Sequence, residues 1–299
     1  MNANPTPISS VVLVGGPDSG KSNYIFRLWL AMNQGGGKIR CDGLPDHLDY
    51  LQAGSQSLLK GEFAQHTPHD VFSENVIPFK IGEGDHAHSG NLIVPDCFGE
   101  RWLSIFRKRE WSQEWEDRIS QPCGILMFVR AASDQIVGPL DWIKCEQMWG
   151  TPVGDANGQE LVVPTQVVMT DWLQFFDEAF AERCDSGFRP KVAMVVSAWD
   201  RVPKDRQGAG PAAFLSEEFP LLSQFVEAND DKFDFAAFGV TVAGGDFDHE
   251  PQFKAQSLNQ DDPLSGGYVM HELGGVPTIV KDMTLPISWI MGFEAERQS

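Results

Sequence analysis

The chain has 299 residues, 42% of them hydrophobic, and a formal net charge of −19 at pH 7. The length allows one large α/β domain or two small ones, and the apolar content is sufficient for a full core. The strong acidity argues against a nucleic acid or an anionic membrane surface as the main partner. A mononucleotide stays compatible with it, because local groups hold a mononucleotide rather than the global charge.

Cysteine usage and the N-terminal residues predict a cytoplasmic protein. The five cysteines are odd in number and widely spaced, which favours neither a disulfide framework nor a zinc site. Residues 1–10 are polar and lack the basic and apolar regions of a signal peptide. No apolar run reaches the roughly 20 residues needed to cross a bilayer.

The first predicted strand, residues 8–14, leads into GGPDSGKS at residues 15–22 and a predicted helix at residues 22–32. A strand, a glycine loop and a helix form the context of the phosphate-binding pattern G-x-x-x-x-G-K-S. Gly15 and Gly20 permit the loop to curl, so that its N–H groups point at a phosphate chain. A plain glycine turn before a helix is the competing interpretation, which the agreement of all three elements disfavours. The predicted nucleotide-binding residues of this segment are Gly15, Pro17, Asp18, Ser19, Gly20, Lys21, Ser22 and Asn23.

Lys21 and Ser22 provide the predicted chemistry of this loop. Lys21 is expected to reach the β and γ phosphates, and the Ser22 hydroxyl is expected to hold Mg²⁺. A second acidic group is needed for the metal, and Asp96 is the candidate because it ends an apolar strand. In the D-x-x-G spacing that follows, the Gly99 N–H is expected to contact the γ-phosphate. A turn aspartate at a strand end is the alternative interpretation of Asp96.

The remaining elements predict an α/β fold. A helix is expected at residues 48–59, followed by an antiparallel hairpin of strands 76–81 and 91–96, with Pro78 suggesting a sheet edge. Helices and strands then alternate, which predicts a mostly parallel sheet with helices on both faces. The later helices are expected at residues 101–120, 165–184, 212–228 and 280–292, and the later strands at residues 123–129, 191–197 and 235–243. We expect a single domain over residues 1–299, with a long insert at about 131–164 and a loop-rich stretch at about 244–275.

Three segments resemble the loops of one known family. GGPDSGKS, DCFGE at residues 96–100 and SAWD at residues 197–200 resemble P-loop GTPases of the TRAFAC type, the translation-factor and Ras-like branch, including bacterial GTPase domains of this kind. The antiparallel strand before DCFGE is also typical of this branch. The resemblance implies the P-loop NTPase three-layer sandwich, with one antiparallel strand in a mostly parallel sheet.

The resemblance implies the other site residues. Glu100 stands where relatives place the residue that positions the attacking water, although a surface carboxylate opening a helix has the same appearance. Thr67 is the only threonine between the first helix and the strand at residues 76–81, and is implied as a switch-loop ligand of Mg²⁺. Asp200 stands where a carboxylate recognises guanine. However, Ser197 and Ala198 replace the usual Asn and Lys, which removes the apolar stem that covers the base.

Three further features bear on the site. Trp199 either packs near the base in place of that stem or belongs to the core. Residues 242–245 resemble a loop that presents N–H groups to the base. Arg101 and Arg130 are candidate arginine fingers by their position in the sequence alone.

The leading hypothesis is a GTP-binding and GTP-hydrolysing switch that acts on protein partners. The expected ligands are GTP, GDP and Mg²⁺, with no direct nucleic-acid contact and no membrane span. An ATPase or another P-loop phosphotransferase is one alternative. A nucleotide-stabilised, non-catalytic scaffold in a multi-protein bacterial system is the other.

Overall fold

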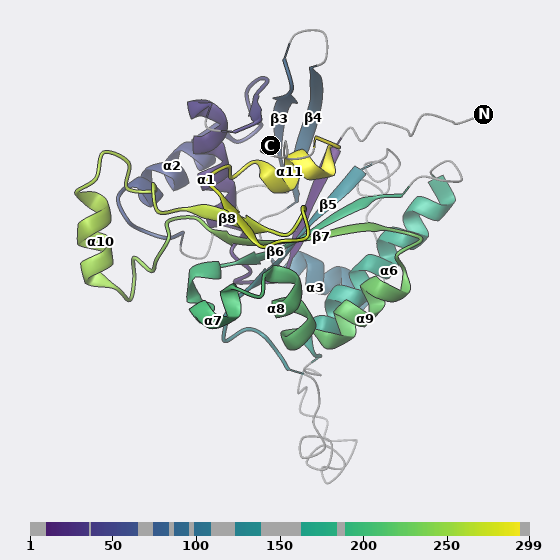
Figure 1. The fold of residues 1–299 in the computed structure, drawn as a ribbon. Helices are drawn as coiled ribbons and strands as arrows, with labels where there is room; N and C mark the ends of the chain where they lie inside the picture. The colour runs from purple at the N-terminus through teal and green to yellow at the C-terminus, as the bar shows by residue number, and fades with distance from the viewer. Residues whose placement is uncertain are drawn as a thin grey trace, which may run out of the picture.

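A computed structural model of the chain describes residues 10–35, 37–64, 74–83, 87–95, 99–108, 123–138, 163–183 and 189–293. Within these residues a nine-stranded sheet forms in the order β2-β3-β4-β1-β5-β6-β7-β8-β9 (Figure 1). The strands are β1 (Ser10–Gly15), β2 (Ile39–Cys41), β3 (Glu74–Ile81), β4 (His88–Pro95), β5 (Cys123–Arg130), β6 (Lys191–Ser197), β7 (Asp234–Thr241), β8 (Tyr268–His271) and β9 (Thr278–Val280).

The central strands of the sheet are parallel. β1 pairs in parallel with β4 and β5, and β6 and β7 continue the parallel run from β5. β3 runs antiparallel to β2 and β4, and β8 runs antiparallel to β7 and β9. The predicted fold class is confirmed, and β8 adds a second antiparallel strand to the predicted one. The parallel strands all end at one edge of the sheet, where ligand-binding loops of such folds begin.

Helices cover both faces of this sheet (Figure 1). The α-helices are α1 (Lys21–Gln34), α2 (Leu48–Leu59), α3 (Gly99–Lys108), α6 (Thr165–Arg183), α7 (Lys204–Gln207), α8 (Pro211–Glu218), α9 (Pro220–Ala228), α10 (Pro251–Leu258) and α11 (Leu285–Ile290). None of the helices in the described part of the chain has the length and apolar character of a membrane span.

The core consists of one apolar layer on each face, and β1 contributes to both. Val11 and Leu13 pack with α1 and α11, whereas Val12 and Val14 pack with α3, α6, α8 and α9. This two-residue alternation follows from the opposite directions of successive side chains in a strand. Because β1 is buried on both faces and held by a neighbour on each side, the loop after it starts from a fixed point.

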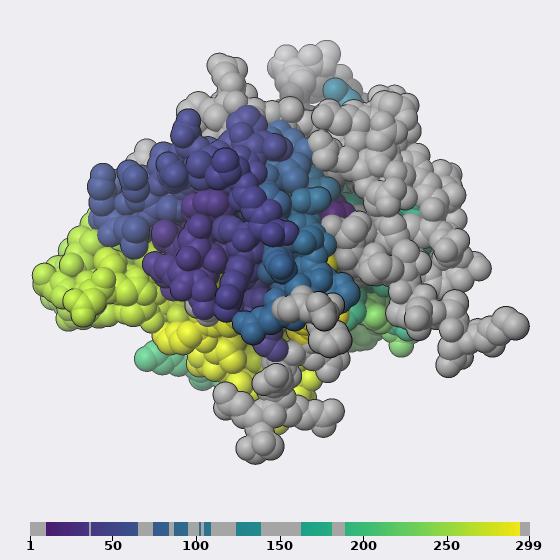
Figure 2. All heavy atoms as spheres, turned by 90° about the horizontal axis from the view of Figure 1, so that it is seen from above, coloured from purple at the N-terminus to yellow at the C-terminus, as the bar shows by residue number. Residues whose placement is uncertain are grey.

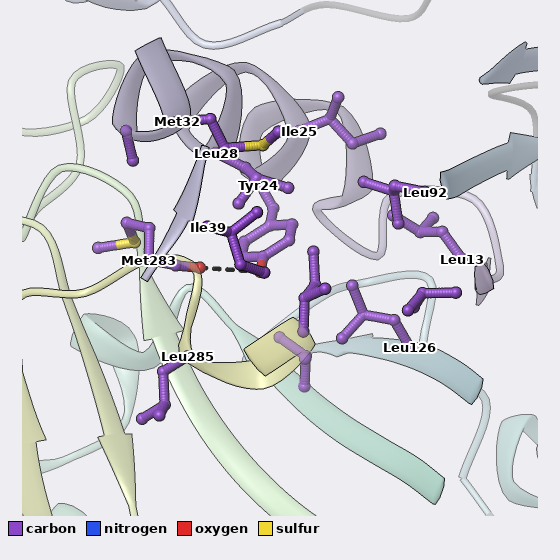
Figure 3. Packing of buried hydrophobic residues seen from close by; sticks show 14 of the residues in the cluster. Leu13, Tyr24, Ile25, Leu28, Met32, Ile39, Leu92, Leu126, Met283 and Leu285 are labelled. Atoms are coloured by element: carbon purple, nitrogen blue, oxygen red, sulfur yellow. Dashed lines mark hydrogen bonds between the residues drawn. The ribbon is translucent and has the colours of Figure 1, made fainter. Parts of the chain in front are cut away.

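Figure 3 shows the layer that holds α1 in place. Tyr24, Ile25, Leu28 and Met32 project from α1 into this layer, at the spacing that brings helical residues onto one side. The Tyr24 hydroxyl donates a hydrogen bond of 2.9 Å to the Met283 carbonyl, just before α11. The first helix is thereby joined to a segment near the C-terminal end of the described chain.

A smaller cluster attaches α10 at one end of the molecule. Leu58, Ala243, Phe247 and Leu264 are buried together, with Phe63 and Phe253 of α10 packed against them. In Figure 2 the yellow-green segment of α10 accordingly lies beside the purple and blue segments of the first 64 residues.

The structure corrects several predicted elements. The helix expected at residues 212–228 is two helices, α8 and α9, because Pro220 lacks an N–H and opens a new helix. The strand that contains Pro78 is not at the edge, since β2 lies outside it, but the pairing with β2 ends at Phe79. The stretch at residues 244–275 includes α10 and β8, and residues 280–292 contain only the short α11.

Candidate phosphate-binding site

The loop between β1 and α1 has a backbone shape that depends on two left-handed residues. Asp18 has φ of 54° and Gly20 has φ of 86°. A Cβ at Gly20 would lie 2.4 Å from the Ser197 Oγ, so only glycine fits there. The N-terminus of α1 has no side-chain cap and no acidic residue in its first turn, which leaves its N–H groups facing the loop.

Lys21 folds back into the centre of the loop. Its Nζ donates hydrogen bonds to the carbonyl oxygens of Gly15 at 2.7 Å and Gly16 at 2.6 Å, and to the Ser19 Oγ at 3.0 Å. The side chain is buried. An ammonium group enclosed by loop oxygens provides a local positive charge in an otherwise acidic protein.

Asp18 connects the loop to the end of β5. Its Oδ1 lies 2.5 Å from Arg130 Nη1, and its Oδ2 accepts a hydrogen bond of 2.7 Å from the Ser133 hydroxyl. Asp18 is a predicted loop residue, Arg130 is a candidate by its position in the sequence alone, and Ser133 is not among the predicted site residues. The Asp18–Arg130 pair spans 112 positions of the chain, so no local pattern could reveal it.

A small cavity lies beside the loop, at the carboxyl ends of β6 and β7. It encloses about 50 Å³ and brings together Asn23, Phe63, Arg130, Asp200 and the segment after β7. Asn23, Gly20 and Asp200 are predicted site residues that this cavity unites. Val242 and Gly245, from the segment 242–245 that is predicted to contact the base, line it too.

The residues at the end of β6 and just after it decide between the two alternatives for Trp199. Ser197 donates a hydrogen bond of 2.8 Å to the Ser19 carbonyl and so holds the loop. Ala198 has φ of 51°, and Trp199 is fully buried against Gly239 and Phe214. Trp199 therefore belongs to the core and does not cover a base.

Asp200 lies half-buried at this cavity, near the Tyr268 hydroxyl. Burial first, and then the negative charge of Asp200, raise the pKa of Tyr268. The Tyr268 hydroxyl therefore stays protonated at neutral pH and lies 3.4 Å from the Gln207 Oε1.

Asp246 is a buried carboxylate at the same cavity that the sequence analysis missed. Its Oδ1 accepts the N–H groups of Asp248 and His249 at 2.9 and 3.1 Å, and its Oδ2 contacts Arg201 and the His249 Nδ1. Burial alone raises the pKa of Asp246, but the hydrogen bonds from Asp248 and His249 outweigh it and lower that pKa below its ordinary value. Asp246 therefore anchors Arg201 as a carboxylate.

A larger cavity of about 330 Å³ lies beside the loop, between α3, β5 and α6. Apolar side chains such as Phe106, Val129 and Trp172 line most of it, and Asp18 and Arg130 lie at its polar end. It adjoins the phosphate loop but does not include Lys21.

Several predicted residues fall outside the described part of the chain. Thr67, Asp96 and the side chain of Glu100 lie outside the described residues. Gly99 is described as the first residue of α3. Of the three predicted Mg²⁺ ligands, only Ser22 is in the described residues, directly after Lys21 at the start of α1.

One comparison with known proteins gives the class of the chain. The model of the Double-GTPase 1 family matches residues 12–290. This match and the antiparallel β3 confirm the resemblance to P-loop GTPases of the TRAFAC type. A comparison with curated proteins finds no match.

Similar solved structures have low identity to this chain. The signal recognition particle receptor SRb-GTP/SRX complex from Chaetomium thermophilum is 13% identical with a TM-score of 0.37, covering 79% of this chain and 91% of that chain. The S. cerevisiae Ski7 GTPase-like domain, bound to GDP and inorganic phosphate, is 13% identical with a TM-score of 0.40, covering 78% and 43%. Methanosarcina barkeri Roco2 RocCORdC bound to GDP is 12% identical with a TM-score of 0.31, covering 88% and 53%.

Proposed function

The chain belongs to the Double-GTPase 1 family, and we propose that it binds GTP with Mg²⁺ at the loop of residues 15–22 and hydrolyses it to GDP. The position of Lys21 is the observation behind this proposal. Its buried ammonium lies within 3.0 Å of three oxygens of the loop, where a triphosphate tail needs a counter-charge.

The backbone of the loop also has a shape that fits a phosphate chain. The N–H groups at the start of α1 have no side-chain cap, and a Cβ at Gly16 would meet no atom within 4 Å. Open space and uncapped N–H groups at a helix start favour an anion. For Mg²⁺, the described residues provide Ser22, whose hydroxyl is the type of oxygen ligand that Mg²⁺ accepts.

The proposal assigns roles to the residues of the motifs. Lys21 neutralises the β and γ phosphates, and the Gly99 N–H contacts the γ-phosphate. Asp200 accepts hydrogen bonds from guanine N1–H and its amino group, so that adenine leaves it unpaired. The remaining assignments are Ser22, Thr67 and Asp96 to Mg²⁺, and Glu100 to the attacking water.

The proposal extends to a switch on protein partners within a single cytoplasmic domain. Loops that contain Thr67 and Gly99 become ordered around the γ-phosphate and are released after hydrolysis, which changes the surface shown to a partner. Family membership supports the nucleotide, and the position of Gly99 at the start of α3 is the observation that supports the proposed switch.

Calorimetry with Mg-GTP and Mg-ATP, combined with phosphate release, tests this function. Lys21→Ala is expected to weaken GTP binding at least about tenfold, because it removes charged hydrogen bonds. Lys80→Ala is the matched control. Lys80 is exposed on β3 and pairs with the start of β4, so it lies near the amino ends of the parallel strands, whereas the phosphate loop lies at their carboxyl ends. This control should bind and hydrolyse GTP like the wild type.

Each other result has a defined meaning. Preference for ATP contradicts the role of Asp200. If the wild type binds GTP but releases phosphate no faster than Lys21→Ala does, the proposed hydrolysis is wrong. The alternative of a nucleotide-stabilised, non-catalytic scaffold is then supported. A folded protein that binds neither nucleotide contradicts the whole proposal.

A further inference from the structure

Arg130 connects the phosphate loop with the cavity that contains Asp200. It is the last residue of β5, and its guanidinium pairs with Asp18 of the loop. Among the described residues that line the two cavities, Arg130 alone belongs to both. A single side chain therefore contacts the predicted phosphate loop through Asp18 and also lines the cavity that contains Asp200.

The cavity at Asp200 is too small to enclose a base. Its volume of about 50 Å³ has room for about four water molecules. A purine that reaches Asp200 must therefore extend past the cavity and over the side chains around it. Phe63, Arg130 and Arg201 are lining residues with a planar group that can contact a purine face.

Two arginines line this cavity, and their partners distinguish them. Arg201 is 38% exposed and is held by Asp246, an 8% exposed carboxylate of the segment after β7 and not of the phosphate loop. Arg130 and its partner Asp18 are 32% and 34% exposed. The guanidinium of Arg130 is therefore fixed at one end by the loop while part of it stays accessible to a ligand.

Residues 197–199, at the end of β6 and directly after it, offer no side chain for this purpose. Ala198 carries only a methyl group, and Trp199 is fully buried in the core. Ser197 is engaged with the Ser19 carbonyl. A covering group for the base must come from another element.

We propose that Arg130 is this covering group. Its guanidinium, fixed by Asp18, packs against the face of the bound guanine and replaces a long side chain at position 198. The interaction is a stacking and cation–π contact, for which the planar guanidinium is suited. The inference rests on the proposed function, because it assumes that GTP and GDP are the ligands.

The test measures the affinity of Arg130→Met for Mg-GTP and GDP, and its rate of GTP hydrolysis. Both affinities should fall about tenfold, because both ligands share the base, while kcat stays within about twofold of the wild type. Arg206→Met is the matched control. Arg206 also pairs with carboxylates and lies 5.4 Å over the ring of Phe214, outside both cavities.

A rescue experiment separates covering the base from bracing the loop. Ala198→Lys in the Arg130→Met background should restore most of the lost affinity, because it supplies the long covering side chain that position 198 lacks. Position 198 already tolerates a Cβ at positive φ, so the substitution adds little backbone strain. If Ala198→Lys does not restore the affinity and tripolyphosphate binding falls by the same factor, Arg130 stabilises the phosphate loop and does not cover the base. This result overturns the inference.

The other outcomes are also decisive. A lower kcat with unchanged affinity shows a role in transition-state charge and overturns the inference. Equal affinity of Arg130→Met and wild type overturns it while the proposed function stands. Failure of the wild type to bind either nucleotide overturns the proposed function itself.

Discussion

Gly20 shows how closely the phosphate loop approaches the neighbouring strand. Its φ is 86°, and its Cα faces the Ser197 side chain with no space for a methyl group. The close approach allows Ser197 to donate to the Ser19 carbonyl. At this residue the conformation and the packing both require glycine.

Gly20→Ala tests this double constraint against Gly35→Ala. Gly35 ends α1 with φ of 69°, and a Cβ there would meet nothing within 4 Å. Gly35→Ala should lower the free energy of unfolding by about 1 kcal/mol from backbone strain alone. Gly20→Ala should cost about 2 kcal/mol or more, because the clash with Ser197 adds to the strain. Urea unfolding measures both, and equal losses would show that the close approach has no energetic consequence.

The site residues that could be predicted are those joined by short sequence spacing. Gly20, Lys21 and Ser22 follow one another in a pattern with a direct physical meaning, so their relation was visible before the structure. The Arg130–Asp18 pair could not be predicted, because it depends on β1 and β5 being neighbours. Asp246 was missed for the same reason, since Arg201 meets it across the ends of β6 and β7.

Elements were predicted best where the apolar pattern was long and bounded by clear breaks. β6 and α2 have the predicted limits, Lys191–Ser197 and Leu48–Leu59. β8 was missed because four residues are too few for a period, and its position beside β7 depends on tertiary pairing. Pro220 interrupts an otherwise continuous helical pattern, and its effect was underestimated.

The segment between β7 and α10 is held in shape by Asp246. This carboxylate accepts two backbone N–H groups and pairs with Arg201, and it lies just before Phe247 of the α10 cluster. The pKa of Asp246 in the folded protein is below its ordinary value of 3.8, mainly because the effect of burial is outweighed by the hydrogen bonds from Asp248 and His249. Its stabilising contribution is therefore complete above pH 3.8 and is lost as the pH falls through the lower folded-state pKa.

Asp246→Asn should lower the free energy of unfolding by about 1 kcal/mol at pH 6, because it removes a charged partner of Arg201 and His249. The difference from wild type should shrink as the pH is lowered through the folded-state pKa, since protonation then removes the same charge from the wild type. Urea unfolding at pH 6 and at several acidic pH values measures it. Asp248→Asn, at an exposed neighbour, should have no effect at pH 6. A difference that is independent of pH would contradict the role of the charge.

Over the whole molecule, the phosphate loop is stabilised from both ends of the chain. α1 follows the loop directly and packs in the same layer as α11 (Figure 3). Tyr24 lies one turn after Lys21, and its hydrogen bond to Met283 joins segments 259 positions apart. Burial first, and then the charge of Asp282, raise the pKa of Tyr24, so its hydroxyl stays protonated and donates. The C-terminal segment thus holds the helix that presents Lys21.

Tyr24→Phe tests this connection without changing the ring contact with Phe128, whose centroid is 5.1 Å away. The variant should lower the free energy of unfolding by about 1–2 kcal/mol, because the buried Met283 carbonyl loses its donor. Hydrogen exchange of the amides in α11 should become faster than in the wild type, since the hydrogen bond acts just before that helix. If global stability falls but exchange in α11 is unchanged relative to other core helices, the hydroxyl contributes only locally to α1. The C-terminal segment would then have no part in positioning Lys21.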